Sequence, residues 1–163
     1  MGATHKHSAD SVQITTRLTS EQIRQSARGA TEGIKSTSVG IAGVRTGYKV
    51  EVTASGPAAM EFIVKNAIGS KVMVFSLSIQ ETQGTTSATS KIDEFRTEQQ
   101  TVMFIPVAPK TMIGFHMYEA WARRFAEAIV SQDPTAQVAS TMSAGSTLVG
   151  GSRMAGRDRA WVS

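Results

Sequence analysis

The chain contains no cysteine, which excludes disulfides, thiolate zinc sites and cysteine nucleophiles. No stretch approaches the roughly 20 apolar residues that a membrane-spanning helix needs, and residues 1–7 lack the apolar run of a signal peptide. We therefore expect a cytoplasmic protein without a membrane span.

The 163 residues, of which 40% are hydrophobic and 18% charged, have the composition of an ordinary globular domain. Periodicity begins near residue 11 and stops at Asp133-Pro134. Small and polar residues such as Gly150-Gly151-Ser152 dominate the rest, as in a linker or tail. These patterns predict a flexible N-terminus at 1–10, one domain at 11–132 and a flexible tail at 133–163.

The formal net charge is +4 and the sequence pI about 9.7, values often seen in nucleic-acid-binding proteins. Binding to phosphates needs clustered cations, however, and the signs alternate here along Arg45, Lys49, Glu51, Glu61 and Lys65. We therefore expect no specific nucleic-acid partner, and only weak, salt-sensitive contacts with phosphates.

Apolar and polar residues alternate over 12–18, which predicts a strand. Thr19 or Ser20 can then cap a short helix, with Glu21 in its first turn. A run of strand patterns follows, the last two forming a hairpin, with Thr46-Gly47 predicted as a turn; the patterns cover 38–45, 48–55, 60–65, 71–80, 87–96 and 100–107.

The most regular pattern covers 110–131 and predicts a long amphipathic helix. One half of it carries large apolar side chains, including Met117, Trp121 and Phe125, and the other half carries His116 and charged residues. The predicted fold class is therefore α+β: a curved antiparallel sheet of about six or seven strands packed on a long C-terminal helix, with one shorter helix after the first strand.

Signals for catalysis are poor. His116 is the one histidine inside the predicted domain, and no serine-nucleophile pattern accompanies it. Asp93 and Glu94 are neighbours on a predicted strand, so their side chains point to opposite faces and do not form a catalytic carboxylate pair. His5 and His7 lie in the predicted flexible terminus. We predict no catalytic residue, no metal site and no cofactor.

The order of one strand, one helix, a run of antiparallel strands and a long helix resembles the START/polyketide-cyclase-like helix-grip superfamily. The likeness is carried mainly by residues 72–129, including Ile105-Pro106-Val107-Ala108-Pro109-Lys110 and the helix that follows. The family often has two short helices after the first strand, whereas this chain has one helical pattern there.

The resemblance implies a cavity between sheet and helix that takes a small hydrophobic molecule. Eight apolar residues would converge on it, and methionine side chains adapt well to irregular ligands; they are Met73, Phe75, Leu77, Met103, Ile105, Met117, Trp121 and Phe125. Non-catalytic binding of such a molecule is the predicted function.

Two alternatives remain open. The same eight residues could fill one another's space, because a well-packed core is the usual state of such residues; the protein would then be a structural or regulatory interaction domain. Such a domain would act through its surface or through its tail, where arginines surround Trp161 and could dock on a protein partner. A lyase or cyclase of the same fold is the third reading, and it needs polar groups inside the cavity.

Overall fold

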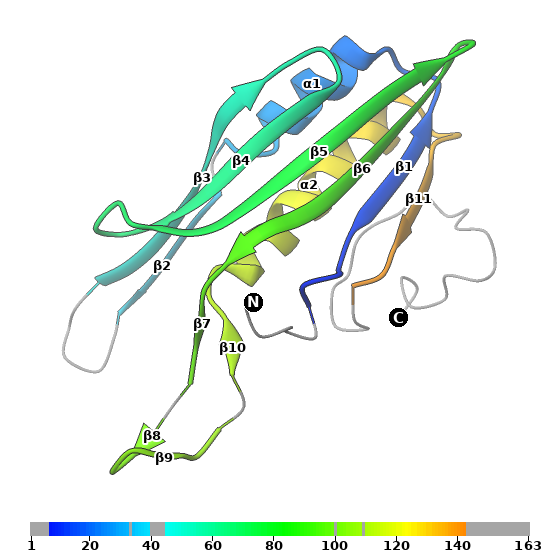
Figure 1. Ribbon diagram of the computed structural model, residues 1–163. Coiled ribbons are helices and arrows are strands. Elements are labelled where there is room, and N and C mark those ends of the chain that lie inside the picture. Colours follow the sequence, from blue (N-terminus) through cyan, green and yellow to red (C-terminus); the bar gives the residue numbers. More distant parts are fainter. Residues whose placement is uncertain (1–6, 33, 40–44, 100, 109, 143–163) are drawn as a thin grey trace.

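The computed structural model describes residues 7–32, 34–39, 45–99, 101–108 and 110–142. Seven antiparallel strands form one sheet, and two helices lie on one of its faces, as Figure 1 shows. The predicted α+β class, with a short helix after the first strand and a long helix after the sheet, is confirmed. Residues 1–6 and 143–163, predicted to be flexible, lie outside the described part of the chain.

The spatial order of the main sheet is β11-β1-β6-β5-β4-β3-β2. From β6 to β2 each strand therefore pairs with its neighbour in sequence. On the other side of β6 lies β1, and β11 pairs with the outer edge of β1. The strands of this sheet are β1 (Val12–Thr16), β2 (Lys35–Val39), β3 (Arg45–Ser55), β4 (Ala59–Asn66), β5 (Lys71–Thr82), β6 (Thr85–Phe95) and β11 (Gln137–Ser140).

Helix α1 (Ser20–Gly29) begins with a capping box. The Thr19 hydroxyl accepts a hydrogen bond from the Gln22 backbone N–H, and the Gln22 side chain accepts one from the Thr19 N–H. The helix buries Ile23, Ser26 and Ala27 toward the core, a narrow face that suits a short helix beside a longer one.

Helix α2 (Phe115–Gln132) is shorter at its start than the predicted span of 110–131, because Gly114 precedes it in the left-handed region at φ 82°. A Cβ at Gly114 would lie 3.2 Å from side-chain atoms of both Val64 and Val72. Only glycine therefore fits where the chain turns into α2.

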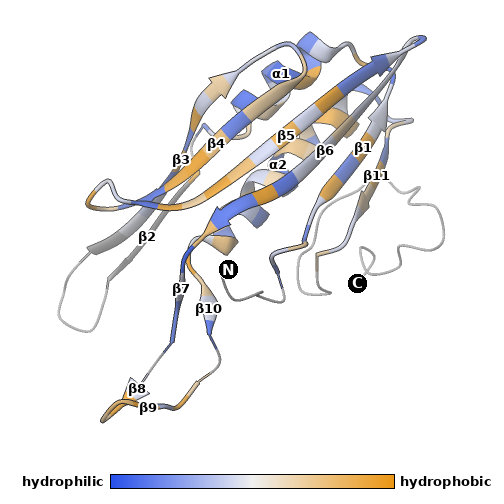
Figure 2. Ribbon diagram, viewed as in Figure 1, coloured by the Kyte–Doolittle hydropathy of each residue, from blue (hydrophilic) through white to orange (hydrophobic). Residues whose placement is uncertain are grey.

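The core lies between the sheet and α2 and is built around aromatic rings that contact one another. Trp121 is fully buried, and its ring centroid lies 4.8 Å from Phe75, 4.9 Å from Phe62 and 5.1 Å from Phe125. The Trp121 indole N–H donates to the Ala27 carbonyl at 3.0 Å, which ties α2 to α1. Figure 2 shows how hydrophobic and hydrophilic residues alternate along the strands that cover this core.

Two predictions about the connections between strands are wrong. Thr46-Gly47 is not a turn: both residues belong to β3 and pair with Ser38 and Thr37 of β2. A Thr-Gly pair only permits a turn, and the sheet neighbour decides whether one forms. The predicted hairpin of 87–96 with 100–107 does not form either, because β6 pairs with β1 and β5 instead; residues 97–112 leave the sheet.

The domain boundary predicted at residue 133 lies too early. β11 pairs with β1, and Ala136, Val138 and Met142 are buried. The four-residue strand is too short for a clear periodic pattern, and its partner lies more than a hundred residues away. At the other end, His7 is held as well: its Nδ1 lies 2.8 Å from the Asp10 carboxylate.

Asp133 joins the end of α2 to the sheet. Its buried carboxylate accepts hydrogen bonds from the Thr135 hydroxyl at 2.6 Å, the Thr16 hydroxyl at 2.6 Å and the Arg17 backbone N–H at 2.9 Å. These donors favour the ionised form and hold the pKa of Asp133 well below its usual range. The residue that ends the helix pattern is thus also a structural junction.

Candidate functional site: an arm with an apolar tip

The eight residues predicted to line a cavity separate into two groups. Six of them lie together in the core, each at most 1% exposed: Met73, Phe75, Leu77, Met117, Trp121 and Phe125. Their rings pack against one another and against Phe62 at centroid distances of about 5 Å. This spacing is that of a packed aromatic core.

Met103 and Ile105 do not join the other six. They are 87% and 66% exposed, and they belong to an arm, residues 97–112, that projects beyond the end of the main sheet (Figure 1). The arm consists of two small two-stranded sheets in succession. β7 (Thr97–Glu98) pairs with β10 (Thr111–Met112) near the body, and β8 (Thr101–Val102) pairs with β9 (Ile105–Pro106) at the far end.

Backbone hydrogen bonds anchor the arm to the body. The Arg96 N–H donates to the Val72 carbonyl at 3.0 Å, and the Ile113 N–H donates to the Arg96 carbonyl at 2.9 Å. Met112, the last residue of β10, is buried in the core cluster. Further out, the Gln99 side chain donates to the Ala108 carbonyl at 2.9 Å, bridging the two sides of the arm.

The far end of the arm is a two-residue hairpin. Val102 pairs with Ile105, and between them Met103 and Phe104 have φ angles of 51° and 67°. Positive φ at both central residues is the conformation of a type I′ turn, in which Asn-Gly is the favoured pair because bulky side chains are strained there. Met-Phe occupies this turn against its backbone preference.

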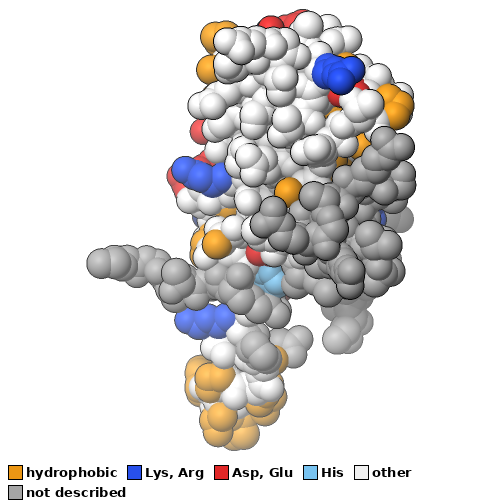
Figure 3. Space-filling view, turned by 90° about the vertical axis from the view of Figure 1, so that its right-hand side faces the viewer, with side chains coloured by type: hydrophobic (Ala, Val, Ile, Leu, Met, Phe, Trp, Pro, Cys, Tyr) orange, Lys and Arg blue, Asp and Glu red, His pale blue; other side chains and the backbone are white. Residues whose placement is uncertain are grey.

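The side chains around this turn form an apolar tip, which we define as Val102, Met103, Phe104, Ile105 and Val107. Their exposed fractions are 58%, 87%, 99%, 66% and 58%, in the same order. Figure 3 shows the tip as a protruding cluster of hydrophobic side chains at the lower end of the molecule. Large side chains of this kind are usually buried, and Ile68 is the other one that is mostly exposed among the described residues.

Charged groups lie toward the body and leave the tip uncharged. Arg96 directly precedes the arm, Glu98 and Lys110 lie in the part of the arm nearest the body, and all three are exposed. Partial burial, together with the negative charge of Glu98, raises the pKa of Tyr48 on β3. The Tyr48 ring in turn meets His116 edge-on at 5.2 Å. The base of the arm is thus polar, and the charge of Glu98 reaches Tyr48 on β3.

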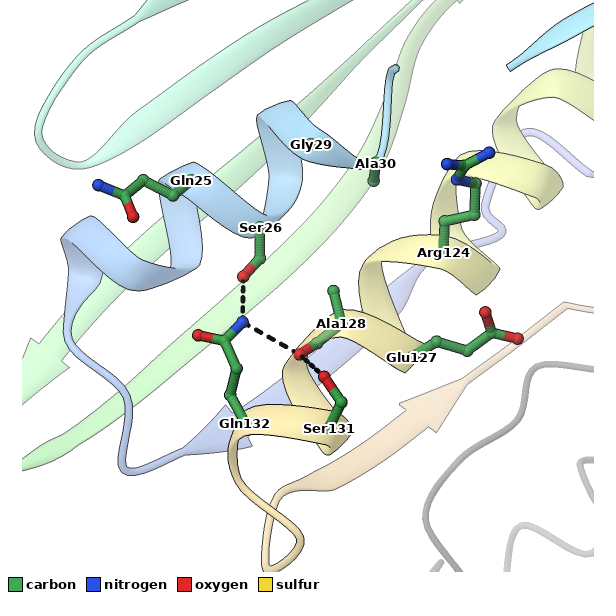
Figure 4. Close-up of a pocket in the computed structure, with 9 residues that line it drawn as sticks. All are labelled: Gln25, Ser26, Gly29, Ala30, Arg124, Glu127, Ala128, Ser131 and Gln132. Carbon is green, nitrogen blue, oxygen red and sulfur yellow. Dashed lines mark hydrogen bonds between the residues drawn. The ribbon is translucent and has the colours of Figure 1, made fainter. Parts of the chain in front are cut away.

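Apart from the arm, the structure has a groove between α1 and α2, on the side of the helices turned away from the sheet. This groove has a volume of about 750 Å³ and is shown in Figure 4. Gln132 crosses it, donating to the Ser26 hydroxyl at 2.8 Å and to the Ala128 carbonyl at 3.1 Å. Arg124 and Glu127 also line it, and none of the eight predicted residues does.

Titratable groups also gather where the N-terminal segment meets α2. His7 stacks on Phe115 at 4.3 Å, and its imidazole faces the Asp10 carboxylate. Burial raises the pKa of Glu119, while the nearby His7 and Arg123 oppose that change. His116 is exposed at this end, and partial desolvation lowers its pKa.

Across the described ranges, no group of three or more His, Asp and Glu side chains is arranged to hold a metal ion. Neither α1 nor α2 is long and apolar enough to cross a membrane. The far end of the arm is the apolar tip, a narrow projection without charged side chains.

Reading the sequence by strand periodicity missed the arm, although residues 102–107 carry a signal for it. Six apolar residues follow one another there without alternation, and Pro106 is among them. A strand of a sheet with one solvated face would alternate, and proline is excluded from central strands. The run therefore does not fit the sheet strand predicted at 100–107.

No protein-family model matches the chain, and no curated protein matches it. Among solved structures, the chain is similar to the one titled "Crystal Structure of Protein Ms6760 from Mycobacterium smegmatis". The two are 13% identical, with 56% of this chain and 76% of that chain covered, at a TM-score of 0.35.

Proposed function

We propose that this protein is a non-catalytic interaction domain that docks on a partner through the apolar tip of its arm. The carrying observation is the tip itself, where five large apolar side chains are each more than half exposed. Leaving them in water forgoes the free energy of burial, roughly 1.5–3 kcal/mol for each side chain that a partner could cover completely.

The turn conformation supports the same proposal. Holding Met103 and Phe104 at positive φ costs about 1–2 kcal/mol per residue, because the Cβ atom crowds the backbone. Asn-Gly would remove most of that cost and would also make the tip more soluble. Strain retained at an exposed position is typical of a functional contact.

The alternative function, binding of a small hydrophobic ligand between sheet and helix, requires a hollow core. A filled core predicts that Leu77→Trp overpacks and lowers the free energy of unfolding by roughly 1–3 kcal/mol. A hollow core would accept the indole, and uptake of an apolar fluorescent probe by the parent would fall in the variant. Urea denaturation and probe titration separate the two, and tolerated Leu77→Trp with reduced uptake would restore the small-ligand function.

Photocrosslinking in native cells tests the docking proposal directly. A benzophenone side chain in place of Phe104 keeps an aromatic group at the tip and captures what covers it. The matched control carries the benzophenone in place of Ile68, which is 86% exposed in the turn between β4 and β5. Both positions are on apolar side chains in turns, so general hydrophobic sticking affects them equally.

We expect a discrete adduct from position 104, several-fold more abundant than any adduct from position 68. The adduct can be a protein or a lipid, and either supports docking through the tip. Equal labelling at the two positions would contradict the proposal.

A further inference from the structure

The proposed docking function does not specify the chemical class of the partner, and the structure of the arm favours one class. Resting on that function, we infer that the partner is a lipid bilayer surface, into which the apolar tip inserts to the depth of the headgroup–acyl boundary. Three features of the described arm lead to this inference: the exposure of the tip on every side, its backbone pairing and its distance from charged groups.

The tip is apolar all round. In a strand that docks on a flat protein surface, alternate side chains face the partner and the rest face water. Here Val102, Met103, Phe104 and Ile105 are consecutive and each more than half exposed. A bilayer covers all sides of a narrow projection at once, and it needs no pocket of matching shape.

The backbone of the tip is also suited to lipid, where every unpaired polar group is costly. Val102 and Ile105 pair across the hairpin, and Pro106, which faces Thr101, has no N–H to satisfy. The turn and the outward-facing edges of β8 and β9 carry the peptide groups that this ladder leaves unpaired. Interfacial insertion, where water and headgroups still reach such groups, fits this pattern better than crossing the hydrocarbon core.

Charges are spaced for the same geometry. Residues 99–109 contain no charged side chain, and Arg96 and Lys110 lie outside that run. Six residues of chain separate Phe104 from Lys110, a reach of at most about 20 Å at 3.3 Å per residue. The cations therefore stay outside the hydrocarbon when the tip reaches the headgroup–acyl boundary, and Glu98 beside them limits the electrostatic contribution.

A second copy of the chain fits less well. Stable protein interfaces cover about 800 Å² and about 20–30 residues on each partner, whereas the tip spans the six residues 102–107. Two narrow projections also cannot enclose each other. A pocket on an unrelated protein is the remaining occupant, and the experiment below distinguishes it.

Because the chain contains no cysteine, a cysteine introduced by substitution is its single labelling site. Phe104→Cys and Ile68→Cys, each in the full chain and each labelled with an environment-sensitive fluorophore, report insertion at the tip and at a matched exposed turn. The probes are unilamellar vesicles of phosphatidylcholine alone and of phosphatidylcholine with phosphatidylserine. We expect a several-fold rise in fluorescence at position 104 with both compositions, little change at position 68, and persistence at high salt.

Unlabelled variants measure the same binding by vesicle flotation. Phe104→Asp should weaken partitioning at least about tenfold, because a carboxylate then has to enter the interface. Gln83→Asp, a matched charge in the left-handed turn between β5 and β6, should leave it unchanged. Lys110→Gln should weaken binding a few-fold, and only to vesicles that contain phosphatidylserine.

Each outcome has a definite meaning. No partitioning, equal partitioning of Phe104→Asp, or binding lost entirely at high salt would overturn lipid insertion. If vesicles fail while crosslinking at position 104 captures a protein, docking through the tip stands and the lipid inference falls. If crosslinking at position 104 also fails to exceed the control at position 68, both fall.

Discussion

Two regions of this protein use the same kinds of side chain and treat them in opposite ways. The inner face of α2 presents Met117, Trp121 and Phe125, all at most 1% exposed. The arm tip presents Met103 and Phe104, which are 87% and 99% exposed. Hydrophobicity alone therefore does not decide burial. What differs is the support behind each region: α2 lies against a seven-stranded sheet, whereas the tip has only its own hairpin.

The contrast also separates stability from function. The core side chains gain burial energy on folding, so changing them should lower stability. The tip side chains gain little on folding and hold a strained turn, so changing them should leave stability intact or raise it. Interactions of the tip would then depend on residues that the fold does not need.

The largest expected effect is that of Trp121→Ala. It removes a fully buried ring and the hydrogen bond to the Ala27 carbonyl, so the free energy of unfolding should fall by roughly 3–5 kcal/mol. Phe104→Ala, which removes an aromatic ring from the tip, should change it by no more than about 0.5 kcal/mol. Urea denaturation followed by circular dichroism measures both. Similar losses in the two variants would mean that the arm packs on the body.

Gly114→Ala tests the point at which arm and core meet. The new Cβ would lie 3.2 Å from both Val64 and Val72, at a backbone φ of 82°. We expect a loss of roughly 2–3 kcal/mol, combining left-handed strain with crowding. Gly29→Ala is the control, because no atom lies within 4 Å of its Cβ position; a helix should gain slightly from it. Thermal unfolding compares them, and equal melting temperatures would contradict the account of Gly114.

Asp133→Asn should cost roughly 1–3 kcal/mol at neutral pH, since the amide loses the charge that four donors share. The pKa of Asp133 is lowered in the folded state, so its contribution is present above the unfolded pKa of about 3.9 and is lost as pH falls below that value. The parent should therefore lose more stability than the variant between about pH 5 and pH 2. Parallel pH profiles would show that the carboxylate charge is not what the junction uses.

The smallest effect should have the opposite sign. Replacing both turn residues, by Met103→Asn with Phe104→Gly, supplies the pair that a type I′ turn favours and relieves the left-handed strain. Because the glycine also adds conformational entropy to the unfolded chain, the net gain in stability should be only about 0.5–1 kcal/mol. The same variant should lose the contacts of the tip with its partner. Chemical denaturation and the crosslinking readout, with the benzophenone then in place of Ile105, measure the two. A loss of stability would show that the native turn is not strained.

The local sequence pattern was sufficient to predict the elements that bury one broad apolar face. The 3.6-residue period around Trp121 predicted α2, and the two-residue period of Met73, Phe75 and Leu77 predicted β5, because each period is set by the local geometry of a helix or a strand. Thr19 marked the start of α1 for a similar reason: a cap is a contact between residues three apart.

Other features depended on residues far apart in the chain. β11 forms because β1 offers it an open edge, and Asp133 is buried because Thr16 and Arg17 meet it from across the sheet. The position of the Met103-Phe104 turn followed from the way Gly114 and the Val72 carbonyl anchor the base of the arm, which carries the tip beyond the sheet. The sequence by itself determined which residues are apolar and at what period. Only the tertiary structure decided which of them find a surface to cover them, because that surface is assembled from strands that are distant in sequence.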